Sequence, residues 1–530
     1  MIKSLITTTL LFFFGSQLTA QIGYSNYIHQ VGRLQKLNKQ YPQLSALQSI
    51  GKTVNGKDIW MLTLGSGKTE TKPAIAIVGG VEGNHLLGTE LAIGVAEKIL
   101  QSTSDSVKQL LSSTTFYVFP NMSPDAMEQF FAPLKYERTG NSSATDDDRD
   151  GKVNEDGYDD IDGNGKITMM RVESPIGDYK ISAEDPRSLV KADLSKGEKG
   201  NYILYTEGID NDKDGSFNED GEGGVAFNKN LPFRHPSFTP GSGEFAVSEP
   251  ESRALLDQLY KLFNVYAVVS FSTNNNLSSP IAFNQANASQ RIVSGYLEQD
   301  AKINAMVSDL YNKSVNMKDA PKNFPAGGDF LSWAYYHYGR YSFSTPGWYV
   351  PKAKVDTTKK DKPAVAIDSI SAFLKWAGSE KAENIFTPWK KVQHPDFPAQ
   401  NVEVGGVEPF SLINPPYSMV NDIVTSHAHF ITLLARAQPN IDITNVRKEK
   451  LGQNITRITV NVMNTGAMAS HSKLGEKSYW VKRINVKLIA DNKQTVLSGK
   501  KIQVLNSLDG LSSKEVSWLV RGTGKIELEA

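Results

Sequence analysis

The chain has 530 residues, of which 39% are hydrophobic and 22% are charged, and both shares are typical of globular proteins. This length exceeds that of one compact domain and predicts two or three folded units. The 57 Lys and Arg residues balance the 57 Asp and Glu residues. Because no basic cluster or aromatic–basic stripe occurs locally either, the composition excludes a partnership with nucleic acid.

The N-terminus has the pattern of a secretory signal peptide. Lys3 precedes an apolar run over residues 5–14, and Ala20 supplies a small residue at a cleavage position. A membrane anchor is the alternative, but the run falls short of the roughly 20 apolar residues that span a bilayer. We expect residues 1–20 to be removed, leaving a secreted or periplasmic protein with no transmembrane segment. The chain contains no cysteine, so neither disulfides nor lipid attachment are expected.

Apolar runs closed by glycine, proline or polar residues predict the strands of a parallel sheet. Their β-rich composition is typical of strands that are buried on both faces. The apolar residues over 87–100 instead recur with helical spacing. The strands are expected over 74–78, 115–119 and 265–271.

A second helix is expected to begin at the capping-box pattern over 248–251, which has proline in its first turn, and to end near Phe263. Strands that alternate with helices predict an α/β fold, a mostly parallel or mixed sheet flanked by helices. Ligands of such sheets bind beyond the carboxyl ends of the strands. Chemistry is therefore expected just after Val78, Phe119 and Phe271.

After about Pro439 the pattern changes to short runs in which apolar and polar residues alternate between turn-rich links. Such runs cover 457–462, 486–489 and 516–520. They predict a small antiparallel β-sandwich over 441–530. The expected organisation is a main domain over 21–440, interrupted by an acidic insert at about 141–222, and followed by this sandwich.

Three loops of the insert share the template Asp-x-Asp-x-Asp/Asn-Gly. Oxygen ligands at positions 1, 3 and 5, with glycine at position 6, form half of an EF-hand-like calcium cage. None of the loops has the position-12 glutamate, so we expect nearby acids to complete the shells: Glu155, Asp156, Glu219 and Asp220. We predict structural Ca²⁺; the alternative is a disordered acidic linker. The predicted calcium ligands are Asp146, Asp148, Asp150, Asp160, Asp162, Asn164, Asp210, Asp212 and Asp214.

Six segments, in order along the chain, carry a family resemblance. The first contains Gly79-Gly80-Val81-Glu82-Gly83-Asn84-His85, and a later one reads Val225-Ala226-Phe227-Asn228-Lys229-Asn230-Leu231-Pro232. The others are Ser123–Asp125, Phe271–Thr273, Gly327–Tyr335 and Tyr341–Thr345. Together they resemble the zinc carboxypeptidases, the carboxypeptidase A-like metallopeptidases. The resemblance covers roughly residues 27–437 and implies the zinc-carboxypeptidase fold, in a bacterial secreted branch with an acidic insert.

The resemblance also implies a zinc site, and the residues at its positions differ from the family pattern. The family binds Zn²⁺ through His-x-x-Glu and a later histidine, and a glutamate is its general base. Here the first pair is exchanged, as Glu82-x-x-His85, and Ser272 occupies the third position. Pro346, which has no proton-accepting side chain, occupies the general-base position. A catalytic zinc normally has three protein ligands and an open water position.

The substrate-binding positions of the family change as well. Its Asn-Arg pair becomes Asn228-Lys229, and lysine keeps the charge but loses the bidentate fork that grips a carboxylate. Arg138 lies in the segment where the family keeps an arginine that polarises the scissile carbonyl. We take these three residues as the substrate-binding candidates. Arg138 as an ion-pair partner of the insert, and Glu82 and His85 as polar groups that satisfy a loop, stay open.

The substitutions favour an exported family member that is catalytically impaired or inactive and binds peptide, or peptidoglycan-derived peptide, in the inherited groove. Each substitution removes a separate requirement of a metallohydrolase mechanism. An active zinc metallocarboxypeptidase with rearranged ligands, completed by a residue from elsewhere, is the first alternative. A cell-surface scaffold or adhesion protein is the second. The cofactors expected are Ca²⁺ at the insert and Zn²⁺ at the inherited positions.

Overall fold

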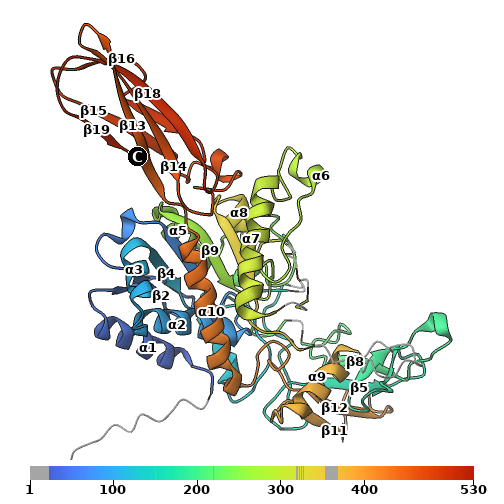
Figure 1. The fold of residues 1–530 in the computed structure, drawn as a ribbon. Coiled ribbons are helices and arrows are strands. Elements are labelled where there is room, and N and C mark those ends of the chain that lie inside the picture. The colour runs from blue at the N-terminus through green and yellow to red at the C-terminus, as the bar shows by residue number, and fades with distance from the viewer. Residues whose placement is uncertain are drawn as a thin grey trace, which may run out of the picture.

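The computed structural model describes residues 23–147, 149, 151–218, 220–317, 320–321, 323, 325, 327–351 and 368–530. The predicted signal peptide lies outside these residues, as do Asp148 and Asp150 of the first predicted calcium loop and the nearby acid Glu219. No helix in the described ranges has the length and apolarity that crossing a bilayer requires. The chain forms a main α/β unit, a second sheet built around the insert, and a C-terminal sandwich that projects from the main unit (Figure 1).

The main sheet has six strands in the order β1-β2-β4-β3-β9-β10. The last four of these are mutually parallel, whereas the first two add an antiparallel edge beside β4. The strands predicted over 74–78, 115–119 and 265–271 have the expected bounds. The strand bounds are β1 Ser45–Lys52, β2 Asp58–Leu64, β3 Ala74–Val78, β4 Thr115–Phe119, β9 Val265–Phe271 and β10 Tyr341–Thr345.

Helices cover both faces of this sheet, because alternate strand residues point to opposite faces. Ile75 and Ile77 of β3 join one apolar core with α1, α2, α3, α7 and α10. Ala76 and Val78 join a second core with α5 and α8. The helices on the two faces are α1 Tyr27–Gln40, α2 Leu86–Gln101, α3 Asp105–Ser113, α5 Pro250–Lys261, α7 Glu298–Val315, α8 Phe330–Tyr336 and α10 Val420–Arg436.

The start of α5 differs from the predicted capping box. Glu249, not Ser248, is the N-cap residue, and it makes no side-chain cap hydrogen bond. The Ser248 hydroxyl donates instead to the Glu249 carboxylate, 2.7 Å away. The Glu249 carboxylate also accepts from the Asn141 amide at 2.7 Å. The side chains of the motif are therefore used in tertiary contacts, and the helix ends at Lys261, two residues before the predicted end.

The insert belongs to a second six-stranded sheet, which the sequence did not predict. Its order is β11-β12-β5-β8-β6-β7, and all of its neighbouring strands are antiparallel. Met170 and Val172 pack with Val402 and Val404 in a small core of their own. The helix α9 (Ser369–Ser379) lies beside this sheet in Figure 1. The strand bounds are β5 Met169–Glu173, β6 Tyr179–Ile181, β7 Leu189–Lys191, β8 Tyr202–Thr206, β11 Phe386–Val392 and β12 Val402–Val407.

The C-terminal unit consists of two antiparallel sheets, β13-β14-β18-β16 and β17-β15-β19. Val460, Val486 and Trp518 belong to the apolar core between them. The structure thus confirms the predicted fold class, an α/β main sheet followed by an antiparallel sandwich. The strand bounds are β13 Ile441–Gly452, β14 Ile455–Asn464, β15 Ile484–Ala490, β16 Thr495–Ser498, β17 Ile502–Leu505, β18 Ser513–Arg521 and β19 Ile526–Glu529.

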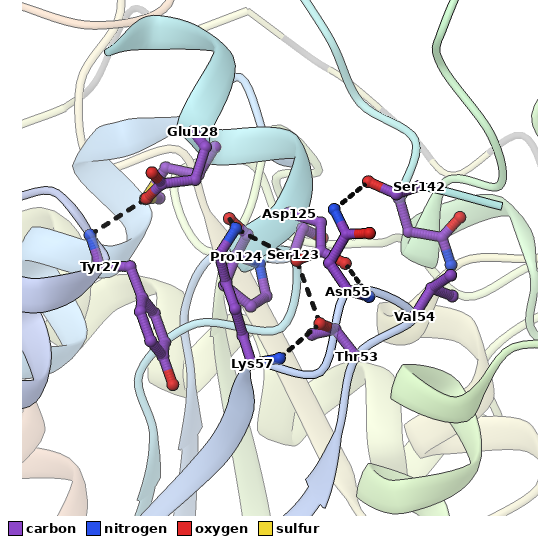
Figure 2. A network of polar contacts seen from close by, with 12 residues as sticks. Tyr27, Thr53, Val54, Asn55, Lys57, Ser123, Pro124, Asp125, Glu128 and Ser142 are labelled. Carbon is purple, nitrogen blue, oxygen red and sulfur yellow. Dashed lines mark hydrogen bonds and ion pairs between the residues drawn. The ribbon is translucent and has the colours of Figure 1, made fainter. Parts of the chain in front are cut away.

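The segment after β4 is fixed by a carboxylate network around Asp125 (Figure 2). Asp125 lies in the first turn of the short helix α4 (Pro124–Met127) and is 3% exposed. Its carboxylate accepts from the Thr53 hydroxyl at 3.0 Å and the Asn55 amide N–H at 3.1 Å, and it pairs with the Lys57 ammonium at 3.2 Å. The network attaches the β1–β2 turn to the strand end that borders the candidate site.

Candidate functional site

The candidate site lies where the loops after β3, β9 and β10 meet, at the carboxyl ends of the parallel strands. Glu82 follows β3, Ser272 follows β9, and Asn228 belongs to a 3₁₀ turn over Phe227–Lys229. The turn after β3 requires glycine at position 80, where φ is +58° and an added Cβ would lie 2.4 Å from the Asn121 side-chain oxygen. Glu82 is therefore positioned at the strand end by a turn that has no room for a side chain at position 80.

The Glu82 carboxylate is the centre of this site and is surrounded by hydrogen-bond donors. It accepts from the Ser272 hydroxyl at 2.7 Å and the Asn228 amide at 2.7 Å. The Thr273 hydroxyl donates at 3.0 Å, and the Thr273 N–H lies 3.4 Å from both oxygens. The side chain of Glu82 is 9% exposed. Burial raises the pKa of Glu82, and the hydrogen bonds from Ser272 and Thr273 oppose that rise.

The ring of His85 faces Pro346, the residue at the general-base position. His85 is the residue before α2, is fully buried, and its Nε2 lies 3.1 Å from the carbonyl oxygen of Pro346. Burial lowers the pKa of His85 to about 4, so the imidazole is neutral at neutral pH and can donate from Nε2. Pro346 thus contributes a backbone acceptor at the position where the family has a catalytic side chain.

The residues at the inherited positions do not supply the usual ligand set of a catalytic zinc. A catalytic zinc takes three protein ligands and keeps one open position. Glu82 is engaged by hydroxyl and amide donors, His85 Nε2 is engaged by a carbonyl, and Ser272 is a neutral hydroxyl that donates to Glu82. Within the described residues, the groups of three or more acids or histidines that could hold a metal lie in the insert and include neither Glu82 nor His85.

The three substrate-binding candidates lie in different surroundings. The amide of Asn228 donates to Glu82, and its oxygen accepts from the N–H of Phe330 at 2.8 Å. Lys229 directs its ammonium to the carbonyl of Pro240 at 3.2 Å and is partly exposed. The Arg138 guanidinium donates to backbone carbonyls of the following loop and to a serine hydroxyl, and no carboxylate of a described residue is among its hydrogen-bond partners: Gly140 at 3.1 Å, Asn141 at 2.6 Å and Ser142 at 2.9 Å.

A buried polar chain that sequence reasoning missed lies behind the Pro346 turn. The Thr345 hydroxyl is 2.6 Å from the Tyr311 hydroxyl, which is 3.1 Å from Nε2 of His427. Nδ1 of His427 is 2.7 Å from the carbonyl of Ile423 within α10. The chain joins β10, α7 and α10 directly beneath the loop that carries Pro346. No sequence spacing indicates it, because its members come from three distant elements.

The three acidic loops adopt one common turn. In each, the carboxylate at position 1 accepts the N–H of the glycine at position 6, and that glycine has a positive φ of +79° to +100°. In the second and third loops, the residue at position 5 also donates its N–H to the carboxylates at positions 1 and 3. The position-1 residues are Asp146, Asp160 and Asp210, and the glycines are Gly151, Gly165 and Gly215.

Carboxylates converge in two of these loops. One oxygen each from Asp160, Asp162 and Glu207 lie within 4.8 Å of one another, as do oxygens from Asp210, Asp212 and Asp214. Glu207 was missed by sequence reasoning because it follows β8, more than 40 residues beyond the loop that it joins.

Two of the nearby acids expected to complete the calcium shells link the loops to each other. Asp156 accepts N–H groups of the third loop region, from Asn211 at 3.0 Å and from Asn218. Asp220 accepts N–H groups of the first, from Asp147 at 3.2 Å and Asn154 at 3.1 Å. The loops are therefore parts of one folded unit.

A cavity of about 430 Å³ lies beside the Arg138 segment. It opens between the second sheet and the segment before Arg138, and four aromatic side chains line it: Tyr136, Tyr158, Phe386 and Trp389. Tyr136 and Tyr158 are stacked, with ring centroids 4.0 Å apart. Glu137 and Glu408 add carboxylates to its lining. A pocket of this size and lining can enclose an apolar or aromatic side chain of a ligand.

Comparison with known proteins assigns the main unit. The profile of the zinc carboxypeptidase family matches residues 31–354, more than half of the chain, and a domain of unknown function matches residues 440–530. The chain belongs to the zinc carboxypeptidase family, for which zinc is the implied metal. This membership confirms the resemblance drawn from the sequence.

The individual relatives match over short stretches. Carboxypeptidase E of Caenorhabditis elegans is 30% identical over 111 residues, which are 20% of this chain and 24% of the relative. Carboxypeptidase M of Mus musculus is 29% identical over 122 residues, 22% of this chain and 28% of the relative. The matched region thus spans about a quarter of the length of these relatives.

Two solved structures illustrate the similarity of the fold. Bovine thrombin-activatable fibrinolysis inhibitor, in complex with tick carboxypeptidase inhibitor, aligns over 78% of this chain and 96% of that chain, with 11% identity and a TM-score of 0.42. Carboxypeptidase A from Helicoverpa armigera aligns over 68% of this chain and 72% of that chain, with 15% identity and a TM-score of 0.38.

Replacing His427 with glutamine is expected to make the protein less sensitive to acid. Burial lowers the pKa of His427 from 6.5 to about 4, so between these values the unfolded chain binds a proton that the folded protein does not. The stability that neutral His427 contributes is complete above about pH 6.5 and is lost toward pH 4, by ~3 kcal/mol in total. Urea unfolding between about pH 7 and pH 4.5 measures this loss, which the variant should show less strongly.

The matched control for that experiment is His29→Gln, because the His29 side chain is exposed. This control should keep the wild-type dependence of stability on pH. Equal slopes for His427→Gln and the wild type would contradict the prediction.

Proposed function

We propose that this protein is an exported, catalytically impaired or inactive zinc-carboxypeptidase-family member that binds peptide, or peptidoglycan-derived peptide, in the groove of the family fold. The observation that carries the proposal is the contact between Glu82 and Ser272, at 2.7 Å, which joins two inherited zinc positions directly. The signal-peptide pattern of residues 1–20 supports export.

Loss of hydrolysis follows from what the mechanism requires. Metal-dependent peptide hydrolysis needs a metal to polarise the carbonyl and lower the pKa of water, and a base to take the proton. Oε1 of Glu82 accepts the hydrogen bonds from Ser272, Thr273 and Asn228, so Oε2 is the one carboxylate oxygen left for a metal. A buried carboxylate without such partners is costly. Pro346 offers no side chain that can accept the proton.

Peptide binding is supported by features beside the buried site. The cavity of about 430 Å³ adjoins the Arg138 segment and offers an aromatic lining to a peptide side chain. The ammonium of Lys229 remains partly exposed and makes no ion pair with a described residue, so it can meet a peptide carboxylate. These groups can bind a peptide without the metal-centred chemistry.

We also propose that the insert binds structural Ca²⁺. Calcium takes carboxylate and carbonyl oxygens in flexible shells, and the converging oxygens of Asp160, Asp162 and Glu207 offer such a set. The common turn supports the proposal, because its backbone N–H groups orient the carboxylates of each loop. In the first loop, Oδ1 of Asp146 is buried with no hydrogen-bond partner among the described residues.

The purified protein is expected to hold less than one equivalent of zinc after dialysis and to release no C-terminal residues from peptides above a chelator-treated control. The physical reason is the missing third ligand and the missing base. Metal analysis and an assay on a panel of peptides measure both.

The combined reversion Glu82→His, His85→Glu, Ser272→His and Pro346→Glu is expected to gain zinc, whereas single reversions should not, because such residues act as a unit. Chelator-sensitive turnover by the unmodified protein would refute the proposal.

Peptide binding is expected to weaken at least about tenfold in Leu412→Glu, which places a charge in the apolar lining of the cavity. Leu412 is 37% exposed, so the substitution should leave the fold intact. The matched control is Leu497→Glu in the sandwich, where the side chain is 42% exposed and lies outside this lining. Isothermal titration with peptides that carry a C-terminal aromatic residue measures the affinity. Equal affinities of both variants would remove the cavity from the binding site.

Calcium is expected to raise the melting temperature of the protein, because a ligand of the native state stabilises it by mass action. Excess chelator should lower the melting temperature, and Asp160→Ala and Asp212→Ala should each abolish part of the calcium-dependent shift. Asp105→Ala, at an exposed acid outside the insert, is the control and should keep the full shift. A melting curve that does not respond to calcium or chelator would refute calcium binding.

A further inference from the structure

A second cavity lies at the opposite end of the main sheet from the candidate site. Its volume is about 380 Å³, and residues of both the sandwich and the main unit line it. Figure 1 shows the junction between these two parts of the chain. Pro73, Val265 and Arg340 line it, and each stands at or just before the first residue of a parallel strand. The sandwich side is formed by residues 470–471 and 481–484. The cavity is therefore separate from the strand ends that carry Glu82 and Ser272.

The charged residues that line this cavity are all basic. Lys72, Arg340, Lys482 and Arg483 contribute to the lining, whereas no aspartate or glutamate does, although acids and bases are equally frequent in the chain. None of the four takes part in an ion pair with a described residue. Such a concentration of one sign in a concave site raises the local concentration of counter-ions.

Arg340 is a buried cation that forms no ion pair with a described residue. It is 3% exposed, and its guanidinium lies 4.5 Å from the ring centroid of Tyr338. One terminal nitrogen donates to the carbonyl of Trp480 at 2.7 Å, but Nε is buried and has no hydrogen-bond partner among the described residues. A buried charge without a counter-charge is strongly unfavourable. The guanidinium can donate to an oxyanion that enters the cavity.

His471 supplies a second unsatisfied group on the sandwich side. It is 6% exposed, and its Nδ1 lies 3.2 Å from the Ser470 hydroxyl, which leaves Nε2 buried with no hydrogen-bond partner among the described residues. Burial lowers the pKa of His471 to about 4; the nearby Glu476 carboxylate opposes this shift, and the cations Arg340 and Arg483 add to it. The neutral ring can donate an N–H to an acceptor oxygen when Nε2 carries the proton.

We propose that this cavity binds a small ligand through a phosphate or sulfate group, held by Arg340 and His471 inside and by Lys482 and Arg483 at the mouth. A doubly charged tetrahedral oxyanion fits this lining better than a carboxylate, because it offers more acceptor oxygens and compensates more of the four positive charges. The volume is that of a small-molecule site. Both the free ion and a small phosphate ester share this chemistry.

The ligand bridges two parts of the chain. Arg340 precedes β10 of the main unit, whereas His471 and Arg483 belong to the sandwich region. These parts already share hydrogen bonds, from the Tyr341 hydroxyl to the His471 carbonyl at 3.1 Å and from the Ser472 hydroxyl to the Gly339 carbonyl at 3.0 Å. An oxyanion in the cavity adds charge-assisted contacts across the same junction, so binding stabilises the attachment of the sandwich. This inference does not depend on the proposed peptide-binding function.

The test is isothermal titration and thermal unfolding of the full mature chain with sodium phosphate, sodium sulfate and glycerol phosphate. Sodium chloride at matched ionic strength is the control for screening. Phosphate or sulfate should bind saturably and raise the melting temperature, whereas chloride should do neither. Tighter binding of glycerol phosphate than of phosphate assigns the site to an ester, and equal or weaker binding assigns it to the free ion. No saturable binding of any of the three oxyanions overturns the proposal.

Variants locate the binding. Arg340→Gln should weaken phosphate binding about 100-fold, and Arg483→Gln about tenfold, in line with charge-assisted hydrogen bonds. Arg483 is exposed, so its variant folds whatever the effect of replacing the buried Arg340. Arg291→Gln, at an exposed arginine outside the cavity, is the matched control and should bind phosphate as the wild type does. If Arg483→Gln and Arg340→Gln, as single variants, both bind phosphate with wild-type affinity, the assignment to this cavity is overturned.

Discussion

The buried carboxylate of Glu82 holds together the carboxyl ends of the main sheet. It accepts from the loop after β9, through Ser272 and Thr273, and from the turn that carries Asn228. Asn228 in turn accepts the N–H of Phe330 at the start of α8. Loops from four distant parts of the chain thus depend on one acceptor group, and they are joined by hydrogen bonds to neutral donors. Such a centre needs no metal to fix the loops, and its donors leave Glu82 fewer free lone pairs for one.

Much of the main unit was predictable because its strands are buried on both faces. The runs that became β3, β4 and β9 are continuously apolar and end at turns, a pattern that depends little on their surroundings. The positions of Glu82, His85, Ser272 and Pro346 also followed from the sequence. Their bonding did not, because whether Glu82 meets a metal or a serine depends on distances of a few tenths of an ångström between residues about 190 apart.

The start of α5 and the acidic loops show two other limits. At α5, Ser248 matched a capping template, yet its hydroxyl donates to the adjacent Glu249 carboxylate and accepts from the Asn230 amide at 2.9 Å, and no cap bond forms. In the loops, the ligand template was local and the turn followed it, since position-6 glycines adopt positive φ in all three. Glu207 could not be found in the same way, because it reaches Asp160 and Asp162 only after β5 and β8 pair. Local templates therefore predicted turns well and partners poorly.

The second sheet has a consequence for the order in which the chain can fold. Its strand β12 pairs with β5, and Arg171 contacts Glu403 across 232 residues of sequence. Until residue 407 has been synthesised, one edge of β5 has no partner, and an unpaired edge is a template for aggregation. Closing so long a loop is also slow, because its entropy must be lost before the pairing is gained. During synthesis, all strands of the main sheet are therefore available once β10 has been made. The second sheet stays incomplete until β12 follows.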